Sequence, residues 1–324
     1  MTCSVQIYNA GCVTGYGLDK GDLAKGVFLG ETAVNEITTF EAHEDSPGLG
    51  ALVPQFKVSQ YFPSIKSYID RSSALSLLAA ADALRFKPDS RDAFEKVGLV
   101  FASRYACLET MRMYANAGLD RGWRFAPPFL FIHSYPNTPA ALMHIELGLK
   151  GFSEVFSGFS ASGLSAICDA VRAIGSGQAG PVLAGGAEAL SELRYNYLYE
   201  KGELGTFDEP ASTQPGEAAA FLLLAPEDGL PDGVLPGARP LAEISLHDAT
   251  DHPKPDVCFC RSCTNCQKTG RAFDLGKFTG DCDAANVPLA VTAFLFSEQF
   301  ADDELAVISD HNNSGTVLLV RKRR

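Results

Sequence analysis

Apolar and polar positions in the first two thirds of the chain alternate between the periods of strands and of helices. Short apolar runs predict strands, and most of these runs suit strands that are buried on both faces. The runs are 4–15, 97–103, 180–190 and 217–229. Apolar residues at helical spacing predict helices, with Asp70 and Ser72 as candidate N-caps of the first. These segments are 67–86, 137–149 and 164–177. Such alternation predicts an α/β domain with a largely parallel sheet.

A stretch rich in proline and glycine at 228–240 predicts a linker. We therefore expect an N-terminal half at 1–227 and a smaller C-terminal half at 241–324. The regular segments expected after the linker are 241–247, 255–260, 288–296 and 304–320. The two halves are unequal in length, so the second is predicted to be a reduced unit.

Composition narrows the function classes. Apolar residues make up 46% and charged residues 20% of 324 residues, which is typical of a globular protein. A net charge of −12 argues against a nucleic-acid partner. No apolar run approaches the roughly 20 residues of a membrane-spanning helix. Nine cysteines without a secretion signal predict reduced thiols and a cytoplasmic protein.

The segment "SEVFSGFSASGLSAICDA", at 153–170, has the layout of a nucleophile elbow, in which a strand turns sharply into a helix. Gly158, Ala161 and Gly163 permit the tight turn, and Ser160 stands at its centre. A working serine nucleophile needs a positioned histidine with a carboxylate behind it. His311 is the candidate histidine, so an acyltransferase or thioesterase-type enzyme that depends on Ser160 remains the alternative function.

A second cluster with possible chemistry is C-x-C-x2-C-x2-C, formed by Cys258, Cys260, Cys263 and Cys266. This spacing allows a zinc or iron–sulfur site. The competing interpretation is a buried strand in which Cys258 and Cys260 share one face. We expect no metal and no cofactor.

Two histidines and two glutamates have simpler interpretations. His144 is expected to be a hydrogen-bonded structural residue, and the same reading applies to His133. Glu188 and Glu217 are expected to brace the ends of strands. A catalytic pair of carboxylates is not expected from these positions.

Three ordered stretches resemble the β-ketoacyl synthases of the thiolase superfamily, which condense acyl chains carried on acyl carrier protein. The stretch at 148–190 is similar to the family's region around its nucleophile, including a strand that ends in Ala-Gly-Gly-Ala-Glu. The stretches "QPGEAAAFLLLA" and "NNSGTVLLVRK" resemble two later family motifs. The resemblance implies an α/β protein with the thiolase-like αβαβα layered fold and a shortened C-terminal half.

The catalytic positions of the family are changed in this chain. The family uses a Cys nucleophile at a helix N-terminus, where a thiolate is a better nucleophile than a hydroxyl. It also uses two His, which promote decarboxylation and stabilise the enolate. The matching positions hold Ser160, Arg261 and Asp281. A carboxylate at 281 would place negative charge where an oxyanion must be bound. The resemblance therefore implies a homologue with no condensing activity of its own.

The shortened second half resembles a chain-length-factor subunit of type II polyketide, aryl polyene or fatty-acid-like systems. The implied partner is an active ketosynthase subunit in a heterodimer or heterotetramer, with acyl carrier protein reached through that partner. The strand "EVFSGF" would pair across the dimer axis, and side chains beside it would limit the depth of the acyl tunnel. The residues expected at this tunnel and interface are Phe131, Ile132, His133, Tyr135, Phe156 and Phe159.

Overall fold

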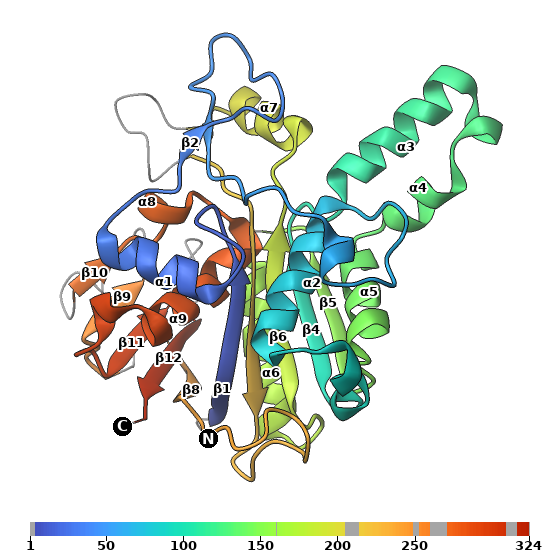
Figure 1. The fold of residues 1–324 in the computed structure, drawn as a ribbon. Coiled ribbons are helices and arrows are strands. Elements are labelled where there is room, and N and C mark those ends of the chain that lie inside the picture. Colours follow the sequence, from blue (N-terminus) through green and yellow to red (C-terminus); the bar gives the residue numbers. More distant parts are fainter. Residues whose placement is uncertain are drawn as a thin grey trace.

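A mixed sheet of ten strands forms the centre of the molecule (Figure 1). The computed structural model describes residues 4–159, 161–204, 214–248, 253–259, 271–308 and 316–323. The strands of the main sheet are β1 (Ser4–Val13), β4 (Gly98–Ser103), β5 (Ser153–Ser157), β6 (Val182–Glu188), β7 (Ala218–Ala225), β8 (Ala242–Asp248), β9 (Val257–Phe259), β10 (Arg271–Phe273), β11 (Leu305–Ile308) and β12 (Thr316–Lys322). Two further short strands, β2 (Asn35–Glu36) and β3 (Leu49–Gly50), pair with each other.

The strand order reveals two similar halves. It runs β10-β9-β11-β12-β8-β1-β7-β6-β4-β5, so each half contributes five strands in the same relative order. The halves join where β1 pairs with β8. Pairing is antiparallel at the centre of the sheet and parallel toward both ends. The expectation of a largely parallel sheet is therefore wrong, because uniformly buried apolar runs do not reveal the direction of their neighbours.

Helices join the strands and cover the sheet. They are α1 (Lys20–Leu29), α2 (Arg71–Leu84), α3 (Leu108–Arg121), α4 (Pro128–His133), α5 (Thr138–Leu147), α6 (Ser162–Gly175), α7 (Glu192–Glu200), α8 (Gly276–Thr279) and α9 (Asn286–Phe296). Short 3-10 helices are η1 (Val58–Gln60), η2 (Pro88–Phe94), η3 (Trp123–Phe125), η5 (Asp283–Ala285) and η6 (Glu298–Phe300). Asp70 caps α2, since its side chain accepts a hydrogen bond from Ser72 N at 2.8 Å. This cap confirms the start predicted for that helix.

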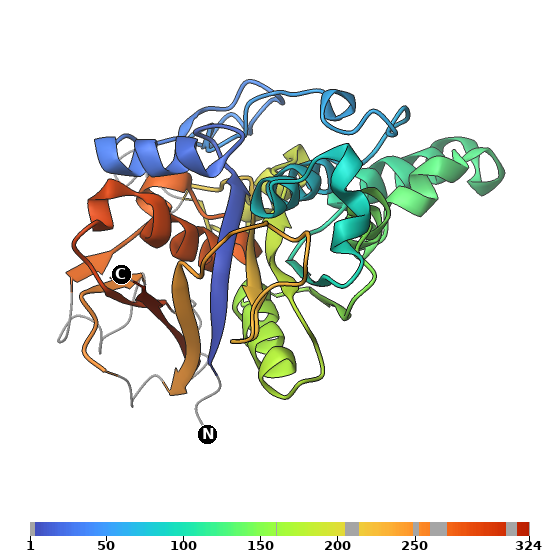
Figure 2. The ribbon, with the colours of Figure 1, turned by 60° about the horizontal axis from the view of Figure 1, so that its bottom comes forward.

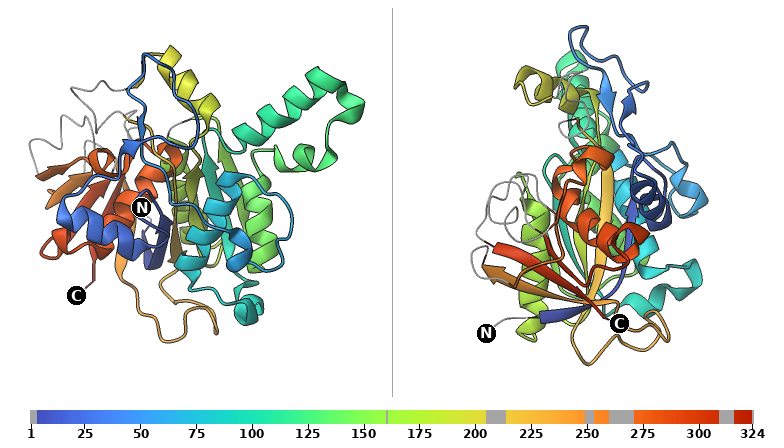
Figure 3. Two further views of the ribbon diagram at one scale, coloured as in Figure 1. Left: turned by 45° about the horizontal axis from the view of Figure 1, so that its top comes forward. Right: turned by 90° about the vertical axis from the view of Figure 1, so that its left-hand side faces the viewer.

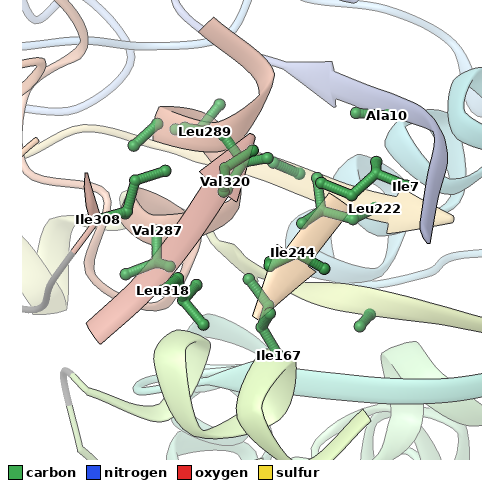
Figure 4. Packing of buried hydrophobic residues seen from close by; sticks show 14 of the residues in the cluster. Ile7, Ala10, Ile167, Leu222, Ile244, Val287, Leu289, Ile308, Leu318 and Val320 are labelled. Carbon is green, nitrogen blue, oxygen red and sulfur yellow. The ribbon is translucent and has the colours of Figure 1, made fainter. Parts of the chain in front are cut away.

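Two apolar clusters lie on opposite faces of the first half of the sheet. One cluster joins α2 and α5 to alternate residues of β1, β4, β6 and β7. The other contains α6 and α9 and takes residues from strands of both halves. Figure 4 shows Ile167 of α6 and Leu289 of α9 in this second cluster, together with Ile244 and Val320 of the C-terminal half. The sheet thus encloses α6 and α9 as an inner layer, and Figure 3 shows helices on both sides of it.

The connections in the second half are much shorter than those in the first. From β1 to β4 the chain passes through α1 and α2, and from β4 to β5 through α3, α4 and α5. The corresponding connections are the eight residues 249–256 and the eleven residues 260–270. The segment 226–241, which includes the predicted linker, contains only turns between β7 and β8. Figure 2 shows β1 between the two unequal parts.

Helices α3 and α4 form a hairpin that projects from the body of the molecule (Figures 1 and 3). The ring of Trp123 lies on Gly118, where an added Cβ would be 2.3 Å from the ring. Tyr114 contacts both Trp123 and Phe131, with ring centroids 5.8 and 5.5 Å apart. These aromatic contacts hold the two helices together outside the main core.

Candidate functional site

The predicted elbow lies between β5 and α6. Gly158 has φ +101°, a conformation that favours glycine, and Ser162 N donates to Phe159 O at 3.2 Å. The strand therefore turns into the helix within a few residues, as predicted from the small-residue knot. Ser160 lies outside the described residues, so the structure does not describe its side chain.

The first turn of α6 packs against the C-terminal half. A Cβ added at Gly163 would lie 2.0 Å from Ala284 O, and one added at Gly186 would lie 2.6 Å from the same oxygen. Both positions therefore require glycine for steric reasons. The Oγ atom of Ser162 is buried at this junction and has no hydrogen-bond partner among the residues that the structure describes. The elbow of one half and the η5 turn of the other thus form a single site.

Asp281 supports the backbone of this junction. Its Oδ1 atom accepts hydrogen bonds from Asp283 N at 3.0 Å and Asn286 Nδ2 at 2.8 Å. Its carbonyl oxygen accepts from Gly216 N at 2.8 Å. The carboxylate thus holds the turn that precedes α9 through Asp283 N and the Asn286 side chain, which is a structural task. Arg261, the other position matched to a family histidine, lies outside the described residues.

A buried ion network fills the space beside the elbow. Asp283 Oδ1 accepts from Arg104 Nη1 at 2.9 Å, and Oδ2 accepts from Arg194 Nη2 at 2.7 Å. The side chain of Arg194 is 1% exposed and that of Asp283 is 6% exposed. Arg194 also donates to the carbonyl oxygens of Ala189, Gly216 and Asp281. The network joins β4, α7 and η5, so it links the two halves.

Tyr105 and Glu188 complete the network. The guanidinium carbons of Arg104 and Arg194 lie 4.9 and 5.1 Å from the centroid of the Tyr105 ring. Glu188 accepts hydrogen bonds from the backbone N–H groups of Arg104 and Tyr105. Burial, reinforced by the charge of Asp283, raises the pKa of Glu188 to about 8. Burial likewise raises the pKa of Tyr105 to about 12. The charged groups beside the elbow are therefore paired with other groups of the protein itself.

Burial would lower the pKa of Arg194, but Asp283 and Glu188 outweigh it, and the net shift is upward. Arg194 therefore stays charged. Within the described part of the chain, the Nε atom of Arg194 and the hydroxyl of Tyr105 have no hydrogen-bond partner.

Sequence analysis did not identify Arg104, Arg194 or Asp283. The sequence marks these residues only weakly. Arg104 directly follows a buried strand, and Arg194 is a charged residue in the first turn of a helix. Their importance depends on three distant segments meeting at one point.

Glu217 braces the end of β7, as Glu188 braces β6, and both predictions are confirmed. Glu217 Oε1 accepts from Val53 N at 2.9 Å and from Arg71 Nη2 at 2.7 Å. A hollow of about 380 Å³ opens next to this ion pair. Its charged lining residues are Asp70, Arg71, Glu109, Arg112, Glu192 and Glu217.

The residues expected at the tunnel and interface lie on the α3–α4 hairpin and along the elbow strand. Phe131, Ile132 and Tyr135 are exposed by 44%, 62% and 47%, and Phe159 is exposed by 46%. Phe156 is half-buried against the inner cluster. Phe131 also contacts Tyr135, with centroids 5.1 Å apart. These two aromatic side chains therefore stabilise the hairpin and also form part of its exposed surface.

The histidines outside the site have structural surroundings. His144 interacts through Nδ1 with Leu149 O at 2.8 Å and through Nε2 with Ser153 Oγ at 2.9 Å, which confirms its predicted role. His133 is half-buried and packs edge-on to Tyr68, and burial lowers its pKa. Its buried Nδ1 has no hydrogen-bond partner among the described residues, so the expectation that His133 is hydrogen-bonded is not met at this atom. His311 lies outside the described residues.

Cys258 lies in a buried strand, as the sequence predicted. The structure places it in a disulfide, so the expectation of reduced thiols is wrong at this residue. Cys12, Cys107 and Cys168 are free thiols. Cys260, Cys263 and Cys266 lie outside the described residues. Within the part of the chain that is described, no group of ligands could hold a metal ion.

Among the described helices, none is both long and apolar enough to cross a membrane.

Comparison with known proteins places this geometry in a family. Residues 3–228 match the model of the β-ketoacyl synthase N-terminal domain. A 3-oxoacyl-(acyl-carrier-protein) synthase 2 from Synechocystis sp. is 25% identical over 196 residues, which cover 59% of this chain and 47% of that protein. The chain thus spans about half the length of the curated relatives it matches.

Solved structures resemble the chain over its full length. The ishigamide ketosynthase/chain length factor superposes with a TM-score of 0.75 at 18% identity, covering 99% of this chain and 100% of that one. A type II polyketide synthase acyl-carrier protein in complex with its ketosynthase bound to the hexaketide gives 0.76 at 18% identity, covering 99% of each chain. At this identity the likeness establishes the fold alone. With the match over residues 3–228, the chain belongs to the β-ketoacyl synthase family and has its thiolase-like fold.

Proposed function

We propose that this chain is a non-condensing, chain-length-factor-like partner of an active ketosynthase in type II polyketide, aryl polyene or fatty-acid-like biosynthesis. The observation that carries the proposal is the buried network of Arg104, Asp283 and Arg194 beside the elbow. A condensing subunit needs an apolar space there for an acyl chain, and it needs histidines to stabilise an enolate. This chain has ion pairs in that space.

An acyl chain entering at this position would meet an electrostatic cost that an apolar pocket does not impose. Burying each methylene contributes about 0.8 kcal/mol. Separating a buried ion pair so that one charge is left unpaired costs about 3–5 kcal/mol. An entering chain would have to displace Arg194 from Asp283 and from three carbonyl oxygens before it could gain contact area. The hollow beside Arg71 and Glu217 has a mixed lining, in which two arginines and four carboxylates lie among apolar residues such as Phe40, Leu52 and Leu190.

The exposed hairpin and the elbow strand supply the surface that a partner would cover. Large apolar side chains project from α3, η3 and α4, and β5 forms one end of the described sheet. Contiguous exposed apolar residues of this kind mark interaction sites. In the proposed complex, Ile132 and its neighbours would form one wall of the partner's acyl tunnel. Their bulk would then limit how far a growing chain extends.

The test compares this chain alone, a ketosynthase alone and the two co-expressed, with malonyl-loaded acyl carrier protein as substrate. We expect condensed product only from the co-expressed pair, and the same yield when Ser160→Ala replaces the wild type. Product formed by this chain alone would contradict the proposal. An acyl group attached covalently at Ser160 would favour the acyltransferase or thioesterase-type alternative.

A second experiment tests the tunnel wall. Ile132→Ala in the co-expressed pair is expected to lengthen the product, because it removes bulk from a side chain that is 62% exposed. Phe131→Ala and Tyr135→Ala probe the same wall but also remove the aromatic contact that joins these two residues. Leu119→Ala, at a side chain 75% exposed on α3, is the matched control. Unchanged product length in all three tunnel variants would contradict the tunnel role.

A further inference from the structure

Tyr68 lies at the base of the projecting hairpin, in the segment that leads into α2. Its hydroxyl oxygen is 2.6 Å from Thr110 Oγ1 and 3.9 Å from Met113 Sδ, both on α3. Its ring packs edge-on to Phe129 and His133 of α4, with centroids 6.0 and 6.1 Å apart. The two contacts on each helix are three or four residues apart, so each pair lies on one helical face. Tyr68 therefore joins the two helices of the hairpin.

A chain of hydrogen bonds leads from this hydroxyl to the body of the molecule. Thr110 Oγ1 donates its one proton to Asp70 Oδ2 at 2.5 Å, so it accepts from Tyr68. Asp70 Oδ1 in turn accepts from the backbone N–H and the hydroxyl of Ser72, at 2.8 and 2.7 Å. Thr110 is fully buried and Asp70 is 2% exposed. The carboxylate that caps α2 thus also holds the hairpin, through a hydrogen bond to a charged group, which is stronger than a neutral one.

The hairpin buries few of its own residues. Helix α3 buries Thr110 and Gly118, and α4 buries Leu130. Gly118 lies under the ring of Trp123, which belongs to the hairpin itself. Thr110 is therefore the buried residue through which α3 is attached to the start of α2. Segments with few buried apolar contacts open at a low cost in free energy, so one hydrogen bond is a large part of what holds them.

Tyr68 touches the helix that carries the proposed tunnel wall. Ile132 directly precedes His133 on α4, which is only six residues long. Because neighbouring residues of so short a helix move together, a shift at His133 carries Ile132 with it. A specificity site must be held within about 0.5 Å by its supporting contacts. The contacts of Tyr68 can therefore set the position of this wall.

We propose that Tyr68 is a positioning residue for the tunnel wall, and that its hydroxyl, relayed through Thr110 to Asp70, fixes α4 relative to the body of the molecule. The inference rests on the proposed function for what the wall does. The attachment of the hairpin concerns this chain alone. Without the hydroxyl, the ring contacts of Tyr68 would remain but α4 would occupy a range of positions, so the depth of the tunnel would be less sharply defined.

Hydrogen exchange read by mass spectrometry tests the attachment on this chain alone. Tyr68→Phe removes the hydroxyl and keeps the ring. We expect the amides of α3 and α4 to exchange about three- to tenfold faster than in wild type, because one hydrogen bond into a buried network is lost. The amides of α5 and α6 should exchange as in wild type. Trp123 is the single tryptophan of the chain and lies on the hairpin, so the decay of its fluorescence anisotropy should show more local motion.

Three further variants separate the relay from the loss of a hydroxyl in general. Tyr61→Phe is the matched control, since Tyr61 is 46% exposed, packs on Phe56 and makes no side-chain hydrogen bond to a described residue. Thr110→Ser keeps the relay and should exchange like wild type. Thr110→Val removes both hydrogen bonds of that side chain and should exchange faster than Tyr68→Phe. Equal exchange in Tyr68→Phe and Tyr61→Phe would overturn the attachment.

Product length tests the positioning role in the co-expressed pair. Tyr68→Phe should broaden the distribution of product lengths while the total yield stays that of wild type. A residue that only stabilises the fold would lower the yield and leave the lengths unchanged. Unchanged lengths in Tyr68→Phe, where Ile132→Ala alters them, would overturn the inference. Unchanged lengths in both variants would overturn the tunnel role of the proposed function, and faster exchange in Tyr68→Phe would still confirm the attachment.

Discussion

Removing the charge of Asp283 should destabilise the chain strongly, and the size of the effect follows from the surroundings of its partners. Arg194 is 1% exposed and would be left buried without its carboxylate. Such a loss costs about 3–5 kcal/mol. Three carbonyl oxygens still hold Arg194, and Arg104 is 27% exposed and can be solvated, so we expect the lower end, about 3 kcal/mol. That is a large share of the 5–15 kcal/mol typical of a folded domain.

The choice of substitution separates charge from backbone strain. Asp283 has φ +43°, a left-handed conformation that asparagine tolerates and alanine does not. Asp283→Asn therefore reports the loss of charge. Asp283→Ala should cost about 1 kcal/mol more. The measurement is the free energy of unfolding from urea titration at neutral pH, with the slope against urea concentration checked for each variant.

A double-mutant cycle measures the coupling energy between Arg194 and Asp283. Arg194→Met combined with Asp283→Asn removes both members of the pair, and we expect a coupling energy of about 2 kcal/mol or more. The control is Asp303→Asn, since its partner Arg271 is 48% exposed and such pairs contribute about 1 kcal/mol or less. If Asp283→Asn lowers the free energy of unfolding no more than Asp303→Asn does, the network does not hold the two halves together. It would then also be no barrier to an acyl chain.

Three further changes have defined outcomes. The pKa of an ordinary glutamate is 4.5, and that of Glu188 is raised to about 8 in the folded state. The free energy of unfolding should therefore fall as the pH rises from 4.5 toward 8, because the unfolded state loses this proton first. Glu188→Gln should flatten that slope, so its stability relative to wild type should rise with pH in urea titrations; a pH-independent difference would show that Glu188 stays charged. Gly163→Ala should cost more than about 3 kcal/mol, because its Cβ would lie 2.0 Å from Ala284 O. Gly180→Ala, with open space around its Cβ, should change thermal stability little, and equal melting temperatures for these two would contradict the packing argument. Ile132→Ala should leave the free energy of unfolding within about 0.5 kcal/mol of wild type, which urea titration measures.

Local sequence was sufficient for the elements that bury apolar residues regularly. The elbow, the helices that became α2, α5 and α6, and the strands that became β4, β6 and β7 all follow from apolar spacing and small residues at a turn. Helices α3 and α7 were missed because few of their buried residues are apolar: α3 buries Thr110 and Gly118, and α7 buries Arg194, Tyr195 and Leu198. The direction of neighbouring strands was also missed, since a strand buried on both faces has the same pattern in either orientation.

The order of the motifs, a serine at the centre of the predicted elbow and the short connections of the second half can all be read from the sequence. Tertiary structure alone decided what occupies the space beside the elbow. Arg104, Arg194 and Asp283 are up to 179 residues apart, and no local pattern links them. Their charges become significant only when the fold removes water from Arg194 and Asp283, because an ion pair that is weak on the surface becomes a strong constraint when it is buried.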